Sequence, residues 1–193
     1  MNSVSRETTE KLAAFKALVI DENQRQNLVS PASIADFDTR HLADGIQLAT
    51  LGKTGSWCDV GSGAGLPGIV IAIITGAPMT LIEPRRLRAD FLRRAVGELG
   101  INAEVSEHKA ERVPDHFDNI TARALAPLDK LFLITEHLAQ RGTRWILPKG
   151  KSAQKELAAA QQSWQGVFTL VPSRTSDAAM IVIAEGVRRR GKR

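Results

Sequence analysis

The residues best suited to chemistry in this chain lie in one glycine-rich segment, residues 59–68, which reads Asp-Val-Gly-Ser-Gly-Ala-Gly-Leu-Pro-Gly. Glycines placed directly after a strand and before a helix allow a tight turn and let a ligand approach the backbone closely. A second carboxylate, Glu83, follows Gly61 by 22 residues. An acid at that distance can accept hydrogen bonds from both hydroxyls of a ribose. Together the two features predict a site for a nucleoside-containing cofactor.

Two alignments of the glycine segment predict different cofactors. From Gly61 the pattern is G-x-G-x-G after an acid, typical of methyltransferases, whereas from Gly63 it is G-x-G-x-x-G ending at Gly68, typical of dinucleotide-binding proteins. Gly61 directly follows the expected strand, which favours the first alignment. A carboxylate at Asp59 would also repel a pyrophosphate but attract the ammonium of an amino-acid group, directly or through water. S-adenosylmethionine carries such an ammonium and no phosphate, so it is the predicted cofactor.

The elements that must position this segment alternate along the chain. Apolar periodicity predicts helices at 7–26, 36–51, 66–75, 86–99, 128–138 and 152–162, and strands at 57–60, 80–82, 103–105, 119–122 and 145–147. Two further strands, 167–171 and 180–184, are expected to pair as an antiparallel hairpin. Strands that alternate with helices predict an α/β fold whose mostly parallel sheet is covered on both faces.

Length and composition fit one globular domain. The chain has 193 residues, 43% of them hydrophobic and 24% charged. We expect an N-terminal helical appendage at 1–52, a core at 53–187 and a basic tail at 188–193. Of the 26 basic residues five lie in that tail, and the other 21 equal the 21 acidic ones. A second basic cluster lies at 85–94. Either cluster could bind RNA phosphates, or simply be a solvated surface.

The sequence gives no sign of a membrane or an oxidising compartment. Its longest nearly apolar run, 66–74, is too short to cross a bilayer, and residues 1–10 lack the pattern of a secretory signal. A single cysteine, Cys58, cannot form an internal disulfide. These features predict a cytoplasmic protein.

The absence of certain residues narrows the methyl-transfer chemistry. The chain contains no tyrosine, which excludes the Asn/Asp-Pro-Pro-Tyr motif used on exocyclic amines. Cys58 falls inside a predicted strand, where it is better placed for packing than for attack on a pyrimidine carbon. Guanine N7 needs neither device, because its lone pair is already nucleophilic and no proton must leave. The residues are therefore compatible with N7 methylation by positioning alone.

In its motifs the chain resembles the bacterial 16S ribosomal RNA guanine-N7 methyltransferases, known as ribosomal RNA small subunit methyltransferase G or glucose-inhibited division protein B. The matching segments run in order through nearly the whole chain: 27–30 (N-L-V-S), 40–44 (R-H-L-A-D), 59–68, 91–93 (F-L-R), 110–111 (A-E), 123–124 (R-A) and 147–151 (L-P-K-G-K). Glycine segments alone are common to many methyltransferases. The ordered series is much more specific.

This resemblance implies a Rossmann-like class I methyltransferase fold, with a seven-stranded sheet, a C-terminal antiparallel hairpin and N-terminal helices. It implies methyl transfer from S-adenosylmethionine to guanine N7, with 16S rRNA or the small ribosomal subunit as partner. We expect a monomer with no obligate protein partner and no metal. Arg123, beside the methionine end, is the expected catalytic residue, and Ala110 and Glu111 are expected to bracket the adenine. The full cofactor set is Asp59, Gly61, Gly63, Leu66, Glu83, Ala110, Glu111 and Arg123.

Three positions depart from the family pattern. The ribose-binding acid, usually aspartate, is Glu83; the serine usual after R-H-x-x-D is Gly45; and the aromatic residue expected before Asn27 is Gln26. Two other functional classes remain open from the sequence, a small-molecule methyltransferase and a non-catalytic nucleotide-binding domain. RNA binding would argue against the first, and binding of S-adenosylmethionine rather than NAD against the second.

Overall fold

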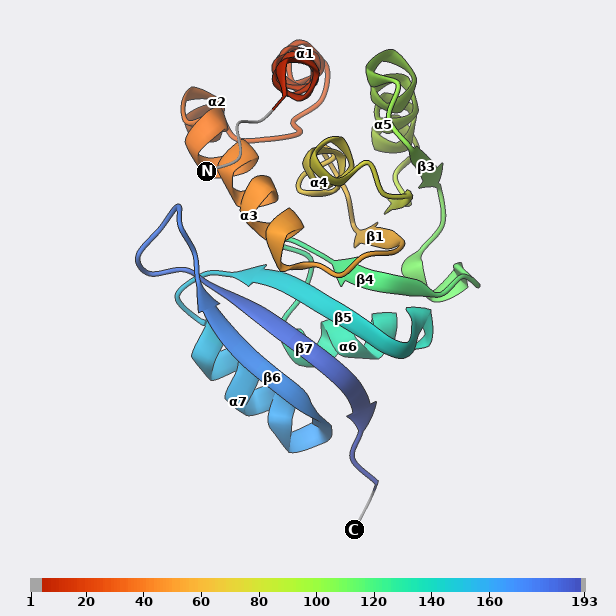
Figure 1. Cartoon of the computed structure of the whole chain (residues 1–193), viewed down its shortest axis with the longest axis vertical. Coiled ribbons are helices and arrows are strands. Elements are labelled where there is room, and N and C mark those ends of the chain that lie inside the picture. The colour runs from red at the N-terminus through yellow and green to blue at the C-terminus, as the bar shows by residue number, and fades with distance from the viewer. Residues whose placement is uncertain (1–4, 192–193) are drawn as a thin grey trace.

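The fold is built on one seven-stranded sheet, seen in a computed structural model that describes residues 5–191 (Figure 1). The strand order is β3-β2-β1-β4-β5-β7-β6. The first five strands are parallel, and β7 runs antiparallel to both β5 and β6. The predicted α/β class and terminal hairpin are confirmed. The strands are β1 (Trp57–Val60), β2 (Met79–Ile82), β3 (Ala103–Ser106), β4 (Phe117–Thr121), β5 (Ala139–Lys149), β6 (Trp164–Pro172) and β7 (Met180–Arg189).

Helices cover both faces of the sheet, with α1 to α5 on one side and α6 and α7 on the other (Figure 1). Each side buries its own apolar cluster, one around Ile69 and Ile71 and the other around Phe132 and Trp145. Apolar strands buried on both faces are what a parallel sheet requires. The helices are α1 (Arg6–Glu22), α2 (Pro31–Ala35), α3 (Ala43–Leu51), α4 (Gly68–Thr75), α5 (Arg86–Leu99), α6 (Leu128–Thr135) and α7 (Ala153–Ser163).

The strand order creates a cleft at the carboxyl ends of β1 and β4. From β1 the chain proceeds outward to β2 and β3, then returns to place β4 on the other side of β1. Loops that leave neighbouring strands in opposite directions open a crevice, and α/β proteins bind ligands at such a switch point. The glycine segment leaves β1 here, so the topology brings it to the expected place.

The N-terminal region is more closely integrated than an appendage. Phe15 and Val19 of α1, Phe37 and Leu48 are fully buried in the cluster that also holds α4. The predicted helix 36–51 is divided, because a π-helical turn at Asp38–Leu42 precedes α3. Such turns rotate side chains away from regular helical positions. Here the turn contains Arg40, which lines the second pocket described below, and His41, which contacts Arg123.

The predicted start of the basic tail at residue 188 is wrong. β7 continues through Arg188 and Arg189, and the Arg189 guanidinium lies 5.5 Å from the centre of the Trp164 ring. Arg190 donates from Nε to the Gln161 carbonyl across 2.9 Å. Strand pairing and cation–π contact therefore fix these arginines to the domain. Residues 192–193 lie outside the described part of the chain.

None of the helices in residues 5–191 combines the length and apolar character needed to cross a membrane.

Candidate functional site

The glycine loop after β1 uses most of its own amide groups to hold its shape. Gly61 and Ser62 donate to the Ile82 carbonyl at 2.8 and 3.1 Å, and Gly63 donates to Glu83 Oε2 at 3.0 Å. Gly61 has a φ of 74°, a conformation that glycine adopts without strain. In dinucleotide-binding folds such amides bind the pyrophosphate. Their engagement here favours a cofactor without phosphate.

Asp59 is a buried carboxylate directly beneath this loop. Its Oδ2 accepts a hydrogen bond from the Gly68 amide at 3.0 Å, which fixes the first residue of α4. Burial raises the pKa of Asp59 to about 7, against the lowering effect of the Gly68 bond and of Arg123. Its Oδ1 is buried with no hydrogen-bond partner among residues 5–191. A buried acceptor without a donor fits the ammonium of S-adenosylmethionine or a water that bridges to it.

Glu83 clamps the loop from the end of β2. Besides accepting from Gly63, it accepts from the Arg85 amide through Oε1 at 2.9 Å, and only 4% of the residue is exposed. Each carboxylate oxygen can accept a second bond, so ribose hydroxyls remain within its capacity. The structure thus adds a positioning role to the acid that the sequence singled out for ribose binding.

A pocket of about 490 Å³ is lined by the glycine loop. The predicted residues Gly61, Gly63, Leu66, Glu83 and Arg123 all line it, whereas the predicted Asp59 is fully buried and does not. Sequence reasoning did not assign several other residues that line this pocket: Leu28, Val29, Arg85 and Arg88. The first two lie in the matching segment 27–30, which was the signal that could have identified them.

Ala110 and Glu111 are not brought into this pocket. They form a 3₁₀ turn after β3, where Ala110 packs into the α6 and α7 side of the core. The Ala110 carbonyl lies 3.0 Å from His137 Nε2, and Glu111 is exposed. Their predicted contact with adenine is therefore not visible in the pocket lining.

Arg123 emerges from the end of β4 and faces the cleft. Its Nη1 lies 2.9 Å from His41 Nδ1 and 4.0 Å from Asp44 Oδ2. Burial lowers the pKa of Arg123, while Asp44 and Asp59 raise it; a guanidinium stays charged throughout. The order R-H-x-x-D and R-A in the sequence is thus realised as a spatial cluster of Arg123, His41 and Asp44.

The segment after Arg123 separates two cavities. Ala124 has a φ of 55°, which is rare for a residue with a side chain, and Leu125 reaches over Gly61. A Cβ built on Gly61 would lie 2.9 Å from Leu125 Cδ1. Residues 123–125 line both the pocket at the glycine loop, the candidate cofactor pocket, and a second pocket of about 690 Å³. Backbone strain of this kind often occurs where a ligand must be bound.

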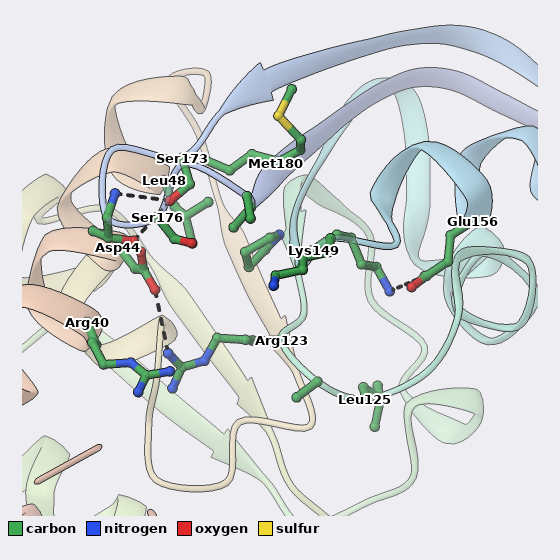
Figure 2. A pocket seen from close by; sticks show the side chains of 18 of the residues that line it. Arg40, Asp44, Leu48, Arg123, Leu125, Lys149, Glu156, Ser173, Ser176 and Met180 are labelled. Atoms are coloured by element: carbon green, nitrogen blue, oxygen red, sulfur yellow. Dashed lines mark hydrogen bonds and ion pairs between the residues drawn. The ribbon is translucent and has the colours of Figure 1, made fainter. Parts of the chain in front are cut away.

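The second pocket is shown from close by in Figure 2. Arg40 and Asp44 lie on one side of it, Lys149 and Glu156 on the other, and Arg123 between them. Its remaining wall is the loop between β6 and β7, which the sequence presented only as the polar turn of a hairpin. That turn could not be recognised as part of a site, because nothing local to it indicates which surface it covers.

The basic cluster at 85–94 is divided between paired and unpaired arginines. Arg93 pairs with Asp90 and Glu107 at 2.8 Å each, and Arg94 pairs with the buried Glu22. In the described part of the chain, Arg85 and Arg88 make no ion pair within 4.0 Å and line the rim of the cofactor pocket. Only part of the cluster is therefore available to a polyanion.

Comparison with known proteins matches residues 8–175 to one family model, GidB: rRNA small subunit methyltransferase G. A protein of that name from Sphingopyxis alaskensis is 42% identical over 97% of this chain and 84% of its own length. Another, from Rhizorhabdus wittichii, is 43% identical over 98% of this chain and 90% of its own length.

Solved structures with similar folds include a SAM-dependent methyltransferase from Aquifex aeolicus. It has a TM-score of 0.62 at 14% identity, covering 88% of this chain and 97% of its own. A mutant of MtNAS in complex with S-adenosylmethionine has a TM-score of 0.60 at 17% identity, covering 92% of this chain and 75% of its own. These likenesses confirm the Rossmann-like methyltransferase fold.

Proposed function

The chain belongs to the rRNA small subunit methyltransferase G family, GidB, and on that premise we propose that its cleft methylates N7 of a guanine in small-subunit rRNA. It is an S-adenosylmethionine-dependent rRNA methyltransferase with a Rossmann-like fold. The guanine position, the roles of individual residues and the form of the RNA substrate are our proposals.

The observation that carries the proposal is the wall shared by the two pockets. Residues 123–125 border the pocket under the glycine loop and also the larger pocket beyond β4 and β5. A methyl donor in the first and a base in the second would meet at this wall. Placing two reactants in such an orientation supplies much of the rate of a bimolecular transfer.

When bound, S-adenosylmethionine supplies an electrophilic methyl group on a sulfonium. Glu83 and Gly63 would hold its ribose side, and Asp59 beneath Gly61 its ammonium. Leu66 contributes an apolar wall. Arg123 would fix the methionine end from the β4 side. Ala110 and Glu111 stay in our proposal as contacts to the adenine, although neither lines the pocket.

The surrounding groups suit a transfer in which no proton is removed. Burial raises the pKa of the Cys58 thiol well above its usual value, so it is a poor nucleophile. His41, whose pKa is lowered to about 4 chiefly by burial, binds Arg123 through Nδ1. Guanine N7 would attack the methyl carbon through its own lone pair, the electrons of the broken C–S bond would stay on sulfur as a neutral thioether, and the methylated base would carry the positive charge. Catalysis here rests on positioning in a cleft of restricted access.

The substrate of this family is rRNA, and we propose the 16S rRNA of the small ribosomal subunit as the specific partner. The unpaired arginines 85 and 88 at the rim of the cleft support contact with its phosphates. We propose a monomer that acts in the cytoplasm, where small subunits are assembled.

Methyl transfer to small ribosomal subunits from cells that lack this enzyme tests the proposal. With labelled S-adenosylmethionine, we expect label in 16S rRNA, at a guanine that becomes sensitive to N7-specific chain cleavage. Arg123→Ala should lower transfer by about 10²-fold, because misplacement of a reactant costs that order of rate. A folded wild-type protein that binds S-adenosylmethionine but labels only small molecules would show a small-molecule methyltransferase instead.

A further inference from the structure

The second pocket contains two carboxylates, and only one of them has an oxygen that accepts no hydrogen bond. Both oxygens of Glu156 are engaged, since its Oε1 accepts from Ser152 Oγ at 2.6 Å and its Oε2 lies 3.0 Å from Lys149 Nζ and 3.3 Å from the Leu128 amide. Asp44 differs. Its Oδ1 accepts from the Thr175 hydroxyl, whereas the nearest cation to Oδ2 in residues 5–191 is Arg123 Nη1 at 4.0 Å.

The surroundings hold Asp44 in place. Its side chain is about three-quarters buried, with 25% exposed, and opens on the pocket. One helical turn further along α3, Gln47 donates to the Pro172 carbonyl at 2.9 Å and accepts from the Arg174 amide at 2.8 Å. Asp44 and Gln47 thus fasten the β6–β7 loop to α3 by three hydrogen bonds. The carboxylate is fixed before any ligand arrives, so a ligand need not pay for ordering it.

We propose that Asp44 reads the Watson–Crick edge of the target guanine by accepting hydrogen bonds from its N1–H and N2–H₂ groups. The inference rests on the proposed function. A guanine that turns N7 toward Leu125, the wall residue that reaches over Gly61, turns this opposite edge away from the cofactor and toward the side of the pocket where Asp44 lies (Figure 2). Figure 2 shows Asp44 and Glu156 on opposite sides of the pocket. Of these two acids, only Asp44 has an oxygen without a hydrogen bond, Oδ2, and its Oδ1, which accepts one bond from Thr175, can accept a second.

The chemistry of this edge explains why a carboxylate selects guanine. Guanine offers two donors there, which match the acceptors of a carboxylate. Adenine places the lone pair of N1 at the same position, which a carboxylate repels. Hypoxanthine keeps N1–H, O6 and N7 but lacks the N2 amino group, so it loses one charge-assisted bond. Asp44 is therefore a specificity-determining residue and takes no part in the methyl transfer itself.

Nucleotide binding to the full chain saturated with S-adenosylhomocysteine tests the inference. Affinities for guanosine, inosine and adenosine monophosphates are measured by ligand-detected NMR. The wild-type protein should prefer the guanosine nucleotide to both others by about tenfold or more, the discrimination expected of a bidentate pair. Asp44→Asn keeps the size and one acceptor but replaces the other by a donor, and should remove that preference.

Two matched variants separate recognition from structure. Glu156→Gln makes the same chemical change on the opposite wall, and Thr175→Val removes the hydroxyl that holds the loop while leaving the carboxylate. Glu156→Gln should leave the preference for guanine unchanged, whereas Thr175→Val should reduce its size but keep its direction, because the carboxylate remains and is only less firmly held. If Thr175→Val loses it as Asp44→Asn does, or if Asp44→Asn retains it, Asp44 only supports the loop and the inference is wrong. Equal affinity of the wild-type protein for all three nucleotides, or binding of none, also overturns it.

The outcome is distinguishable from failure of the proposed function. The same wild-type preparation is assayed for label transfer to small ribosomal subunits. Absence of transfer contradicts the proposed function. Transfer by the wild-type protein together with an unchanged nucleotide preference in Asp44→Asn contradicts only the role of Asp44.

Discussion

Arg123 donates a hydrogen bond from Nη1 to His41 Nδ1 across 2.9 Å, which makes the histidine an acceptor inside a cluster of cations. Burial, followed by the charges of Arg123 and Arg40, lowers the pKa of His41 to about 4. The Phe37 ring packs edge-on against the imidazole with 5.1 Å between centroids. The imidazole is therefore neutral at physiological pH, and it orients Arg123 without competing for protons.

The lowered pKa of His41 predicts acid sensitivity of the folded state. Above pH 6.5 the histidine is neutral in both the folded and the unfolded chain. Between pH 6.5 and about 4 the unfolded chain binds a proton that the folded one excludes, so the free energy of unfolding should fall as pH decreases. His41→Asn keeps an acceptor for Arg123 but does not titrate. Urea unfolding at several pH values should show a shallower decline in this variant, and parallel curves for both proteins would contradict the prediction.

Asp59 should lose a proton when the cofactor binds. Its pKa of about 7 means that much of the free protein carries a proton there at neutral pH. An ammonium near Oδ1 favours the charged carboxylate and lowers that pKa. Calorimetry of S-adenosylhomocysteine binding in buffers of different ionisation enthalpy should report proton release near pH 7. The release should be absent with 5′-methylthioadenosine, which lacks the amino-acid group, and in Asp59→Asn. Equal release with both ligands would place the ammonium elsewhere.

Gly61→Val should abolish cofactor binding. A branched residue is disfavoured at a φ of 74°, and its Cβ would already lie 2.9 Å from Leu125 before any branch is added. Gly97→Ala is the matched control, because its Cβ would meet nothing within 4 Å in helix α5 and should stabilise the fold by about 0.5–1 kcal/mol. Affinity for S-adenosylhomocysteine and thermal unfolding are measured for both. If the Gly61→Val protein folds and binds S-adenosylhomocysteine with normal affinity, the glycine loop is not part of the cofactor site.

Glu83→Ala should weaken cofactor binding by about 1.5–3 kcal/mol, the range for hydrogen bonds to a charged group. Part of that loss will come through the loop, because Glu83 also holds the amides of Gly63 and Arg85. Glu111→Ala tests the proposed contact of Glu111 with the adenine. Calorimetry compares the cofactor affinities of the Glu83→Ala and Glu111→Ala variants. If the Glu111 side chain only faces solvent, its removal should change the affinity by less than about 0.5 kcal/mol.

Arg85 and Arg88 should contribute more to RNA binding than Arg93 and Arg94. The first two lack ion-pair partners within 4.0 Å in residues 5–191, whereas the second two are engaged with Asp90, Glu107 and Glu22. Each lost contact to a single strand should reduce the logarithmic salt slope by about 0.7. The double variant Arg85→Gln/Arg88→Gln should therefore shift the slope by about 1.4 in a potassium chloride series. An equal shift in the salt slope for Arg93→Gln/Arg94→Gln would mean that these two arginines contact RNA despite their ion pairs, and would contradict the prediction.

Much of the sheet and the cofactor loop could be predicted because their signals are local. Periodicity located α5 with the bounds that the structure shows, and the acid and glycines of 59–68 fall where β1 ends. The division of the helix at 36–51 could not be predicted, since apolar spacing does not distinguish a short π-helical turn from the α-helix around it. The extent of β7 was also missed. Arg188 and Arg189 appear as a charged tail until strand pairing and Trp164 give them partners.

The second pocket could not be predicted from the sequence, because the segments that form its walls come together only in the folded protein. Asp44 and Thr175 are separated by 131 residues, and the bonds of Gln47 to the same loop span 125 and 127. Motifs name residues one segment at a time, so Asp44 was found within the segment 40–44, and its partner Thr175 from the terminal hairpin was not.

That long-range attachment also orders events as the protein is made. The residues that line the cofactor pocket all precede residue 126, whereas the second pocket needs the loop between β6 and β7. Because chains are synthesised from the N-terminus, every residue that lines the first pocket is made before the β6–β7 loop that completes the second. A nascent chain paused before β6 contains every residue that lines the first pocket but lacks the loop that completes the second pocket. The pocket that we propose to receive the base is therefore completed last, with the final hairpin.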